Sequence, residues 1–109
     1  MPNTTESTPI STLEKLHSET ALFHWKDLQR FFAQGKVLLV DQTLNLVNTA
    51  SLFADDKVKE LEPLINAESV RAPSNDQART WFAGDVELWV VVVAPYVIVQ
   101  EQSASDLLK

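Results

Sequence analysis

The chain has 109 residues, the length of one domain, because a chain of this size builds one hydrophobic core and not two. It contains no cysteine, which excludes disulfides, thiolate metal sites and cysteine nucleophiles. Its 15 acidic and 9 basic residues give a net charge of −6, which disfavours nucleic acid as a partner. The two glycines, Gly35 and Gly84, are too few and too far apart for a glycine-rich phosphate-binding loop.

Both ends of the chain are predicted to lack structure. Residues 1–10 are rich in Thr, Ser, Asn and Pro and lack the basic and apolar regions of a signal peptide, so we expect a disordered lead. Residues 103–109 are expected to form a flexible tail. The longest apolar run, residues 86–99, contains Glu87 and Pro95 and is too short to span a bilayer. We therefore expect a cytoplasmic protein without a membrane partner.

Residues 12–34 are predicted to form two helices or one kinked helix. Ser11 and Glu14 have the spacing of a capping box, and apolar residues then recur at helical spacing. The apolar face changes its phase at Trp25. Gly35 is the expected left-handed residue that ends this segment.

Residues 37–40, Val-Leu-Leu-Val, are predicted to form a short buried strand. A helix then fits the apolar spacing of residues 44–54, with Asn45 as its N-cap, and a hairpin of residues 37–40 with 44–47 is the alternative. Asp55 or Asp56 is expected to cap the next helix, whose apolar face runs from residue 58 to residue 65. Pro63 falls inside that helix and limits its length.

Residues 70–72 are predicted to form a second short strand, which Pro73 ends. Ser74 and Gln77 have the spacing of a second capping box and begin a helix that stops at Gly84. Residues 86–100 carry the strongest strand signal of the chain. These elements predict a single α+β domain over residues 11–102, with a small, mostly antiparallel sheet of about three to four strands and helices packed on one face.

The apolar segment of residues 86–99 is the most informative part of the sequence. Twelve of its 14 residues are apolar, on both alternating faces, so a strand formed here must be covered on both sides. As one strand it would extend roughly 46 Å, too long for a domain of this size. The chain therefore either bends at Ala94-Pro95 into two strands of one sheet, or its second half projects and pairs with another copy.

Under the second alternative, residues 95–100 form part of a homodimer interface, since an exposed apolar edge would otherwise aggregate. Large apolar and aromatic side chains are the residues that most often anchor such an interface. The candidate interaction residues are Trp89, Val91, Val93, Pro95, Tyr96 and Ile98.

Few residues indicate catalysis or metal binding. His17 and His24 would lie about 10.5 Å apart along one helix, too far to share a metal ion without other ligands. Helix capping explains the adjacent Asp55 and Asp56 better than acid–base chemistry does. The sequence therefore predicts no catalytic residue, no metal site and no cofactor. Weak candidates for a ligand pocket are Trp25, Asp41, Asp55, Asp56 and Arg71.

A resemblance to a known family is carried by three stretches: residues 16–28, residues 35–56, and Trp81 with residues 91–101. These stretches are similar to a bacterial family known as domain of unknown function 2288. The resemblance spans residues 11–102, and the Pro-Tyr-Val-Ile-Val-Gln-Glu sequence of residues 95–101 is its most distinctive piece. Ala94 stands where the family usually has a polar residue, and Asn45 where it usually has an acid. The resemblance implies a small cytoplasmic bacterial protein and supplies no activity, cofactor or catalytic residue.

Two functions remain open at this point. The leading hypothesis is a non-enzymatic protein-interaction or self-associating module, with a second copy and a further protein as its partners. The alternative is a small-ligand-binding domain or minor enzyme with a pocket between the N-terminal helices and the sheet. A packed symmetric interface through residues 89–100 would favour the first, and a pocket with convergent polar groups the second.

Overall fold

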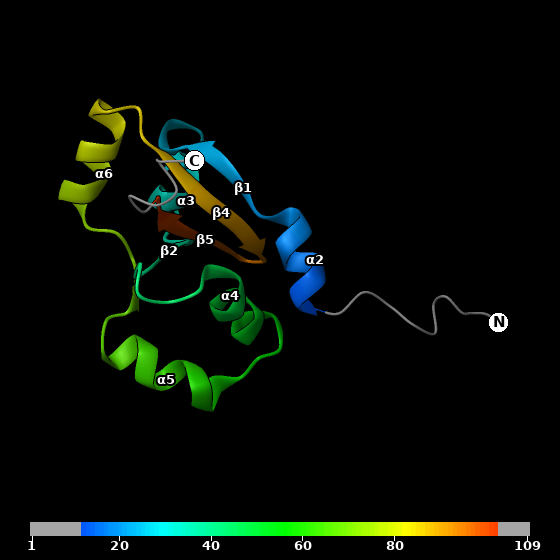
Figure 1. Cartoon of the computed structure of the whole chain (residues 1–109). Helices are drawn as coiled ribbons and strands as arrows, with labels where there is room; N and C mark the ends of the chain where they lie inside the picture. Colours follow the sequence, from blue (N-terminus) through cyan, green and yellow to red (C-terminus); the bar gives the residue numbers. More distant parts are fainter. Residues whose placement is uncertain (1–11, 103–109) are drawn as a thin grey trace.

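A computed structural model describes residues 12–102 of the chain (Figure 1). Ser11, the expected first cap, and the two terminal segments lie outside the described residues. The elements in chain order are α2 (Thr12–Glu19), β1 (Ala21–His24), the 3-10 helix η1 (Trp25–Leu28), α3 (Gln29–Ala33), β2 (Val37–Val40), α4 (Leu46–Ala54), α5 (Val58–Asn66), β3 (Val70–Arg71), α6 (Asn75–Ala83), β4 (Glu87–Val93) and β5 (Tyr96–Glu101).

The five strands form one open, mixed sheet in the order β1-β4-β5-β2-β3. Strands β5 and β2 run parallel, and the other neighbouring pairs are antiparallel. The α+β class is as predicted. The sheet has one strand more than expected, β1. It includes a parallel pair because β2 lies beside β5 rather than forming a hairpin with residues 44–47.

Strand β1 is the element that the sequence did not predict. The expected helical stretch of residues 12–34 is interrupted after Glu19, and Ala21–His24 pairs with β4 in the register Ala21 opposite Val90 and His24 opposite Glu87. Helical structure resumes at Trp25, where the apolar phase of the sequence changes. The pairing with β4, and not the local pattern, decides the conformation of these four residues.

The bend at Ala94-Pro95 is confirmed. Strands β4 and β5 form an antiparallel hairpin in which Val93 lies opposite Tyr96, and the Ala94–Pro95 peptide bond is cis. Strand β5 lies between β4 and β2 and is paired on both sides. The second half of the apolar segment therefore completes the sheet of its own chain.

Helices cover both faces of the sheet, so the prediction of helices on one face is wrong (Figure 1). The physical reason is that residues 86–99 are apolar on both faces, so helices must bury each face. One face packs against η1, α3 and α6 around the buried residues Trp25, Leu28, Val37, Leu39, Ala78, Trp81, Leu88, Val90, Val97 and Val99. The other packs against α2, α4 and α5 around Leu16, Val40, Leu46, Val47, Ala50, Val70, Val91 and Ile98.

Two predicted helix caps are confirmed and one is wrong. Asn45 caps α4, since its side chain accepts a hydrogen bond from the amide of Asn48. Ser74 and Gln77 form a reciprocal capping box at the start of α6. Asp55 and Asp56 do not cap α5: Asp55 is the C-cap of α4, Asp56 follows it with a positive φ of 58°, and Lys57 is the N-cap of α5.

Candidate functional site

Strand β1 forms an open edge of the sheet. All four of its side chains are exposed, including Leu22 at 38% and Phe23 at 43%. The opposite edge, β3, is two residues long and carries Arg71, two features that discourage pairing with another chain. Between its ends β1 has neither a charged residue nor a proline, so it lacks those protections.

The hydrogen bonds of the ladder show which amides of β1 face outward. The amide of Trp25 donates to the carbonyl oxygen of Val86 at 2.8 Å, next to the pair of His24 with Glu87. Hydrogen-bonded and non-bonded pairs alternate in an antiparallel ladder, so Phe23 bonds toward β4. The N–H and C=O groups of Leu22 and His24 therefore point away from β4, toward the open edge.

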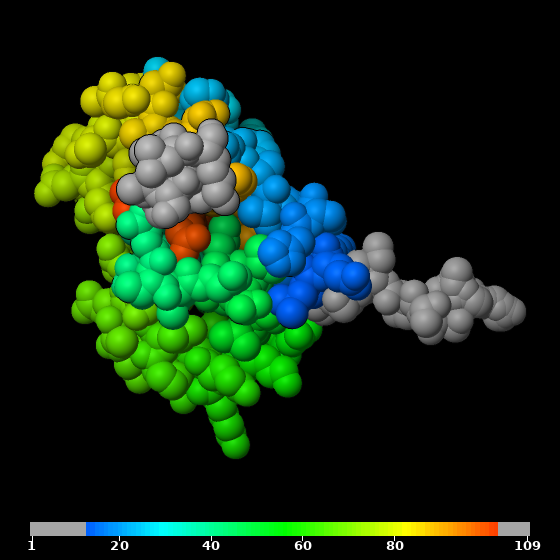
Figure 2. Space-filling view, in the orientation of Figure 1, coloured from blue at the N-terminus to red at the C-terminus, as the bar shows by residue number. Residues whose placement is uncertain are grey.

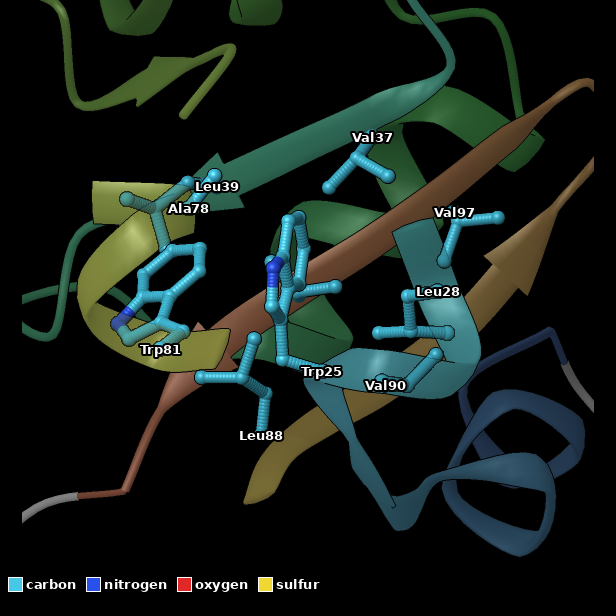
Figure 3. Packing of buried hydrophobic residues seen from close by; sticks show 10 residues of the cluster. Trp25, Leu28, Val37, Leu39, Ala78, Trp81, Leu88, Val90 and Val97 are labelled. Atoms are coloured by element: carbon cyan, nitrogen blue, oxygen red, sulfur yellow. The ribbon is translucent and has the colours of Figure 1, made fainter. Parts of the chain in front are cut away.

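An apolar cavity of about 440 Å³ lies on the face of the sheet that η1 and α3 cover. Figure 3 shows Leu28, Val90 and Val97 lying together at this end of the core. Val92, which also lines the cavity, is 56% exposed, so part of the apolar lining is open to solvent. The full lining is Phe23, Asp27, Leu28, Arg30, Phe31, Lys36, Val90, Val92, Ala94, Pro95 and Val97.

Two cations stand at this apolar cavity. The guanidinium carbon of Arg30 lies 5.0 Å from the centre of the Phe31 ring, which also lines the cavity, and Lys36 immediately precedes β2. Neither Arg30 nor Lys36 forms an ion pair with a described residue, although Asp27 also lines the cavity. In a chain with a net charge of −6, the cavity is thus a local exception that carries more positive than negative side chains.

A second, more polar recess of about 570 Å³ lies on the other face, between α2, the segment after β2, and the ends of β4 and β5. It opens on the face seen in Figure 2, between the blue residues of α2 and the blue-green residues that follow β2. Its lining includes His17, Asn45, Trp89 and Gln100. The amide groups here are occupied within the chain, since Gln100 Nε2 donates to two carbonyl oxygens and Asn45 Oδ1 accepts from Asn48.

The six predicted interaction residues are divided by the fold. Val91 and Ile98 are fully buried beneath α2 and α4, so they belong to the core and not to a surface. Trp89 and Val93 are partly buried on the same face. Pro95 is exposed, and Tyr96 is 37% exposed with its ring 5.7 Å from that of Phe53. These residues do not form one continuous surface.

The five predicted pocket residues also lie apart. Trp25 is fully buried against Phe32 and Trp81. Asp41 follows β2, Arg71 ends β3, and Asp56 lies at the turn after α4. Asp55 lines a small cavity of about 360 Å³ with Lys15, Glu19 and residues 92–94. The apolar cavity and the polar recess contain none of the five.

Residues 12–102 contain no group of three or more His, Asp or Glu side chains placed to hold a metal ion. His24 instead lies between two carboxylates at the end of β1, with Nδ1 3.2 Å from Asp85 Oδ1 and Nε2 3.6 Å from Glu87 Oε2. None of the described helices is both long and apolar enough to cross a membrane.

The residues that form the β1 edge and the apolar cavity have no local signature in the sequence. Arg30, Lys36, Phe23 and Val92 come from four separate segments, and only the fold brings them together. A weak signal did exist: Lys36 and Arg30 are two of the four bases in residues 1–36, the third of the chain in which acids and bases balance. The apolar spacing of residues 12–34 predicts a helix at Leu22 and Phe23, so it does not indicate their exposure at a sheet edge.

Comparison with known proteins gives a family and a fold. Residues 11–101 match the family described as "Protein of unknown function (DUF2288)". A search of curated proteins finds no match. The chain is similar to the NMR solution structure of PA1075 from Pseudomonas aeruginosa, with 38% identity and a TM-score of 0.74 over 88% of this chain and 90% of that one. The chain belongs to the DUF2288 family.

Proposed function

We propose that this protein is a non-enzymatic interaction module that self-associates through the open edge of β1. The observation that carries the proposal is that Leu22 and His24 present their backbone groups at an edge where all four side chains are exposed. Unpaired edges of this kind are templates for pairing with another chain. The interface is thus assigned to β1 and not to β5, whose two sides are already paired.

A second copy is the occupant that the edge favours. Two β1 strands related by a two-fold axis through Leu22 run antiparallel, so that each Leu22 donates to and accepts from its copy. The same register places Thr20 beside residue 24 of the partner copy, although the amide of Thr20 already donates to the carbonyl oxygen of His17 in its own chain. No lysine or glutamate lies among residues 20–23 to oppose this approach. The short strand predicts a weak dimer that dissociates in the micromolar range.

The test is a charge exchange at Leu22. In the proposed register residue 22 lies beside residue 22 of the copy, so Leu22→Lys and Leu22→Glu each place like charges in contact and give monomers. Mixing the two variants restores a dimer, because a lysine then faces a glutamate. Val58→Lys is the control, since Val58 is an exposed apolar residue on α5, away from β1.

Sedimentation velocity at several protein concentrations measures the outcome. We expect dimers for the wild type and Val58→Lys, monomers for each Leu22 variant alone, and dimers for their mixture. A wild-type protein that stays monomeric at high micromolar concentration contradicts the proposal. Equal dimerisation of all variants contradicts the assignment to β1.

A small-ligand-binding domain is the second candidate function. One observation favours it: the apolar cavity lies between the N-terminal elements η1 and α3 and the sheet, the position that the sequence predicts for a pocket. Its volume of about 440 Å³ falls in the range usual for small-ligand sites. Binding of any small molecule that shifts the NMR signals of Val90 and Val97 supports this function.

A further inference from the structure

We propose that the apolar cavity binds one monomeric fatty acid, with its hydrocarbon chain against β4 and β5 and its carboxylate beside Arg30 and Lys36. The proposal rests on the second candidate function, small-ligand binding, and does not depend on self-association through β1. It assigns a chemical class to a cavity whose lining combines apolar side chains with two cations.

The apolar part of the lining determines the tail of the ligand. Eight of the 11 lining residues are Phe, Leu, Val, Ala or Pro, and they come from β1, η1, α3, β4, β5 and the turn at Ala94-Pro95. No polar side chain stands among the residues of β4 and β5 that line the cavity, which are Val90, Val92 and Val97. A polar ligand would lose its hydration here without gaining hydrogen bonds from the strands, whereas a hydrocarbon chain would bury apolar surface.

The charged part of the lining determines the head group. Arg30 and Lys36 are not engaged in ion pairs with any described residue, so an incoming anion displaces no carboxylate. Arg30 is held over the Phe31 ring at 5.0 Å, and this contact keeps the guanidinium at the cavity. Asp27 is the one acid of the lining and disfavours an amphiphile with a larger negative charge, which is why we favour a single carboxylate.

The geometry favours a free fatty acid over a membrane surface. The cavity is a local hollow between helix and sheet, and it lies in a chain of net charge −6, which an anionic bilayer repels over an extended contact. The eight apolar residues and two cations that line the cavity provide for one hydrocarbon chain and one carboxylate. A monomeric ligand matches that extent.

The first test is a length series of alkanoates, measured by calorimetry with the full chain below the micellar concentration. Each methylene buried in the cavity strengthens binding about fourfold, so octanoate binds about 15-fold more tightly than hexanoate, and the gain stops once the cavity is full. Alkylammonium ions of equal length are the charge control and bind more weakly. Methyl signals of Val90, Val92 and Val97 shift on titration with decanoate.

Variants distinguish the contribution of the carboxylate to binding from that of the hydrocarbon chain. Arg30→Gln and Lys36→Gln each lower the affinity for decanoate about two- to fivefold and leave the affinity for decanol unchanged. Lys59→Gln, on the exposed surface of α5, is the matched control and changes neither. Val92→Trp weakens both ligands, because the larger side chain occupies the cavity, and the exposure of Val92 keeps the fold tolerant of this change.

The outcomes distinguish fatty-acid binding from small-ligand binding in general. Decanol or decylammonium binding as tightly as decanoate overturns the fatty-acid assignment and leaves small-ligand binding in place. Failure of all three ligands, with no shift at Val90 or Val97, overturns small-ligand binding at this cavity as well. Binding to anionic phospholipid vesicles without binding to monomeric decanoate overturns the proposal in favour of a membrane contact.

Discussion

Gln100 and Asp41, 59 residues apart in the sequence, are joined by a hydrogen bond in which Gln100 Nε2 donates to the backbone oxygen of Asp41 at 3.0 Å. The same nitrogen donates to the backbone oxygen of Leu44 at 2.8 Å. Both hydrogens of one partly buried amide thus hold the segment that connects β2 to α4. Gln100 is the one glutamine of the Pro-Tyr-Val-Ile-Val-Gln-Glu sequence, and these two bonds give it a structural role.

Replacing Gln100 by leucine removes both bonds and leaves two carbonyl oxygens without their donor. We expect a loss of about 1–3 kcal/mol in the free energy of unfolding, measured by urea denaturation. Gln42→Leu is the matched control, because Gln42 Nε2 also donates to two carbonyl oxygens, those of Glu101 and Gln102, but Gln42 is exposed. Water replaces its bonds, so the control changes stability by about 0.5 kcal/mol or less. Equal losses would show that Gln100 has no special role.

The helices and caps of the second half of the chain could be predicted because their signals are local. Asn45 and the Ser74–Gln77 box satisfy amides three residues away, and Gly35 adopts the positive φ of 74° that its lack of a side chain permits. The two apolar faces of residues 86–99 likewise predicted a doubly covered strand, and the bend at Ala94-Pro95 followed from its length.

Strand β1 and the cavities could not be predicted, because their causes are not local. Ala21–His24 is a strand because Leu88 and Val90 stand beside it, more than 60 residues later in the chain. The apolar cavity depends on the parallel pairing of β2 with β5, which brings Lys36 to Val97, and no short-range pattern specifies that pairing. The two apolar faces of residues 86–99 indicate that both faces of the sheet are covered. They do not indicate which segments of the chain cover each face.

Four helices end in the same backbone motif, and in three of them the residue of positive φ is not a glycine. After α3, α4, α5 and α6, paired bonds close the last turn around a residue of positive φ. After α5, for example, Ser69 donates to Leu64 and Glu68 donates to Ile65. The residues of positive φ are Gly35 at 74°, Asp56 at 58°, Glu68 at 61° and Asp85 at 50°. The acids therefore occupy a conformation that disfavours side chains with a Cβ atom.

Glu68→Gly is expected to stabilise the protein by about 1 kcal/mol, because glycine adopts this conformation without strain. The hydrogen bond from Arg71 Nη1 to the backbone oxygen of Glu68 survives the change. Asp56→Gly raises the free energy of unfolding by less, since aspartate tolerates positive φ better than glutamate does. Thermal and urea unfolding measure both.

Gly35→Ala is the reverse experiment. An added Cβ would meet nothing within 4 Å, so its cost is the backbone conformation alone, about 1 kcal/mol. Asp85→Gly is a less clean variant, because Asp85 also pairs with His24 and Lys26. A stabilising Gly35→Ala, or a destabilising Glu68→Gly, would contradict the account.

Trp25 and Trp81 are expected to couple energetically. Their rings meet edge to face, with centroids 5.0 Å apart and an interplanar angle of 67°, and Figure 3 shows the nitrogen of Trp25 on the side turned toward Trp81. Trp25 Nε1 is buried without a hydrogen-bond acceptor among the described residues, whereas Trp81 Nε1 donates to Glu101 Oε2 at 3.1 Å. Trp81 and Phe32 are the aromatic neighbours of Trp25, with ring centroids 5.0 Å and 5.4 Å away, and the Trp81 ring is the nearer of the two.

A double-mutant cycle measures this coupling. Trp25→Phe and Trp81→Phe are expected to show an interaction energy of about 0.5–1.5 kcal/mol in urea unfolding. Trp25→Phe with Trp89→Phe is the control cycle, because Trp89 packs on the opposite face of the sheet, and it should be additive within about 0.5 kcal/mol. Coupling of the same size in both cycles would mean that the effect is not specific to the contact between Trp25 and Trp81.

Amide hydrogen exchange tests both the alternating direction of the β1 amides and the pairing of β1 with a second copy. The amide of Phe23 bonds to β4 and should be protected at every protein concentration, whereas the amide of Leu22 points to the open edge and should exchange rapidly in the monomer. Above the dissociation constant of the dimer, Leu22 and His24 become protected and Phe23 changes little. In Leu22→Glu the His24 amide stays unprotected at high concentration, since the variant does not pair. Protection of the Leu22 amide in dilute wild-type protein would contradict the outward orientation, and rapid exchange of this amide in a proven dimer would place the interface elsewhere.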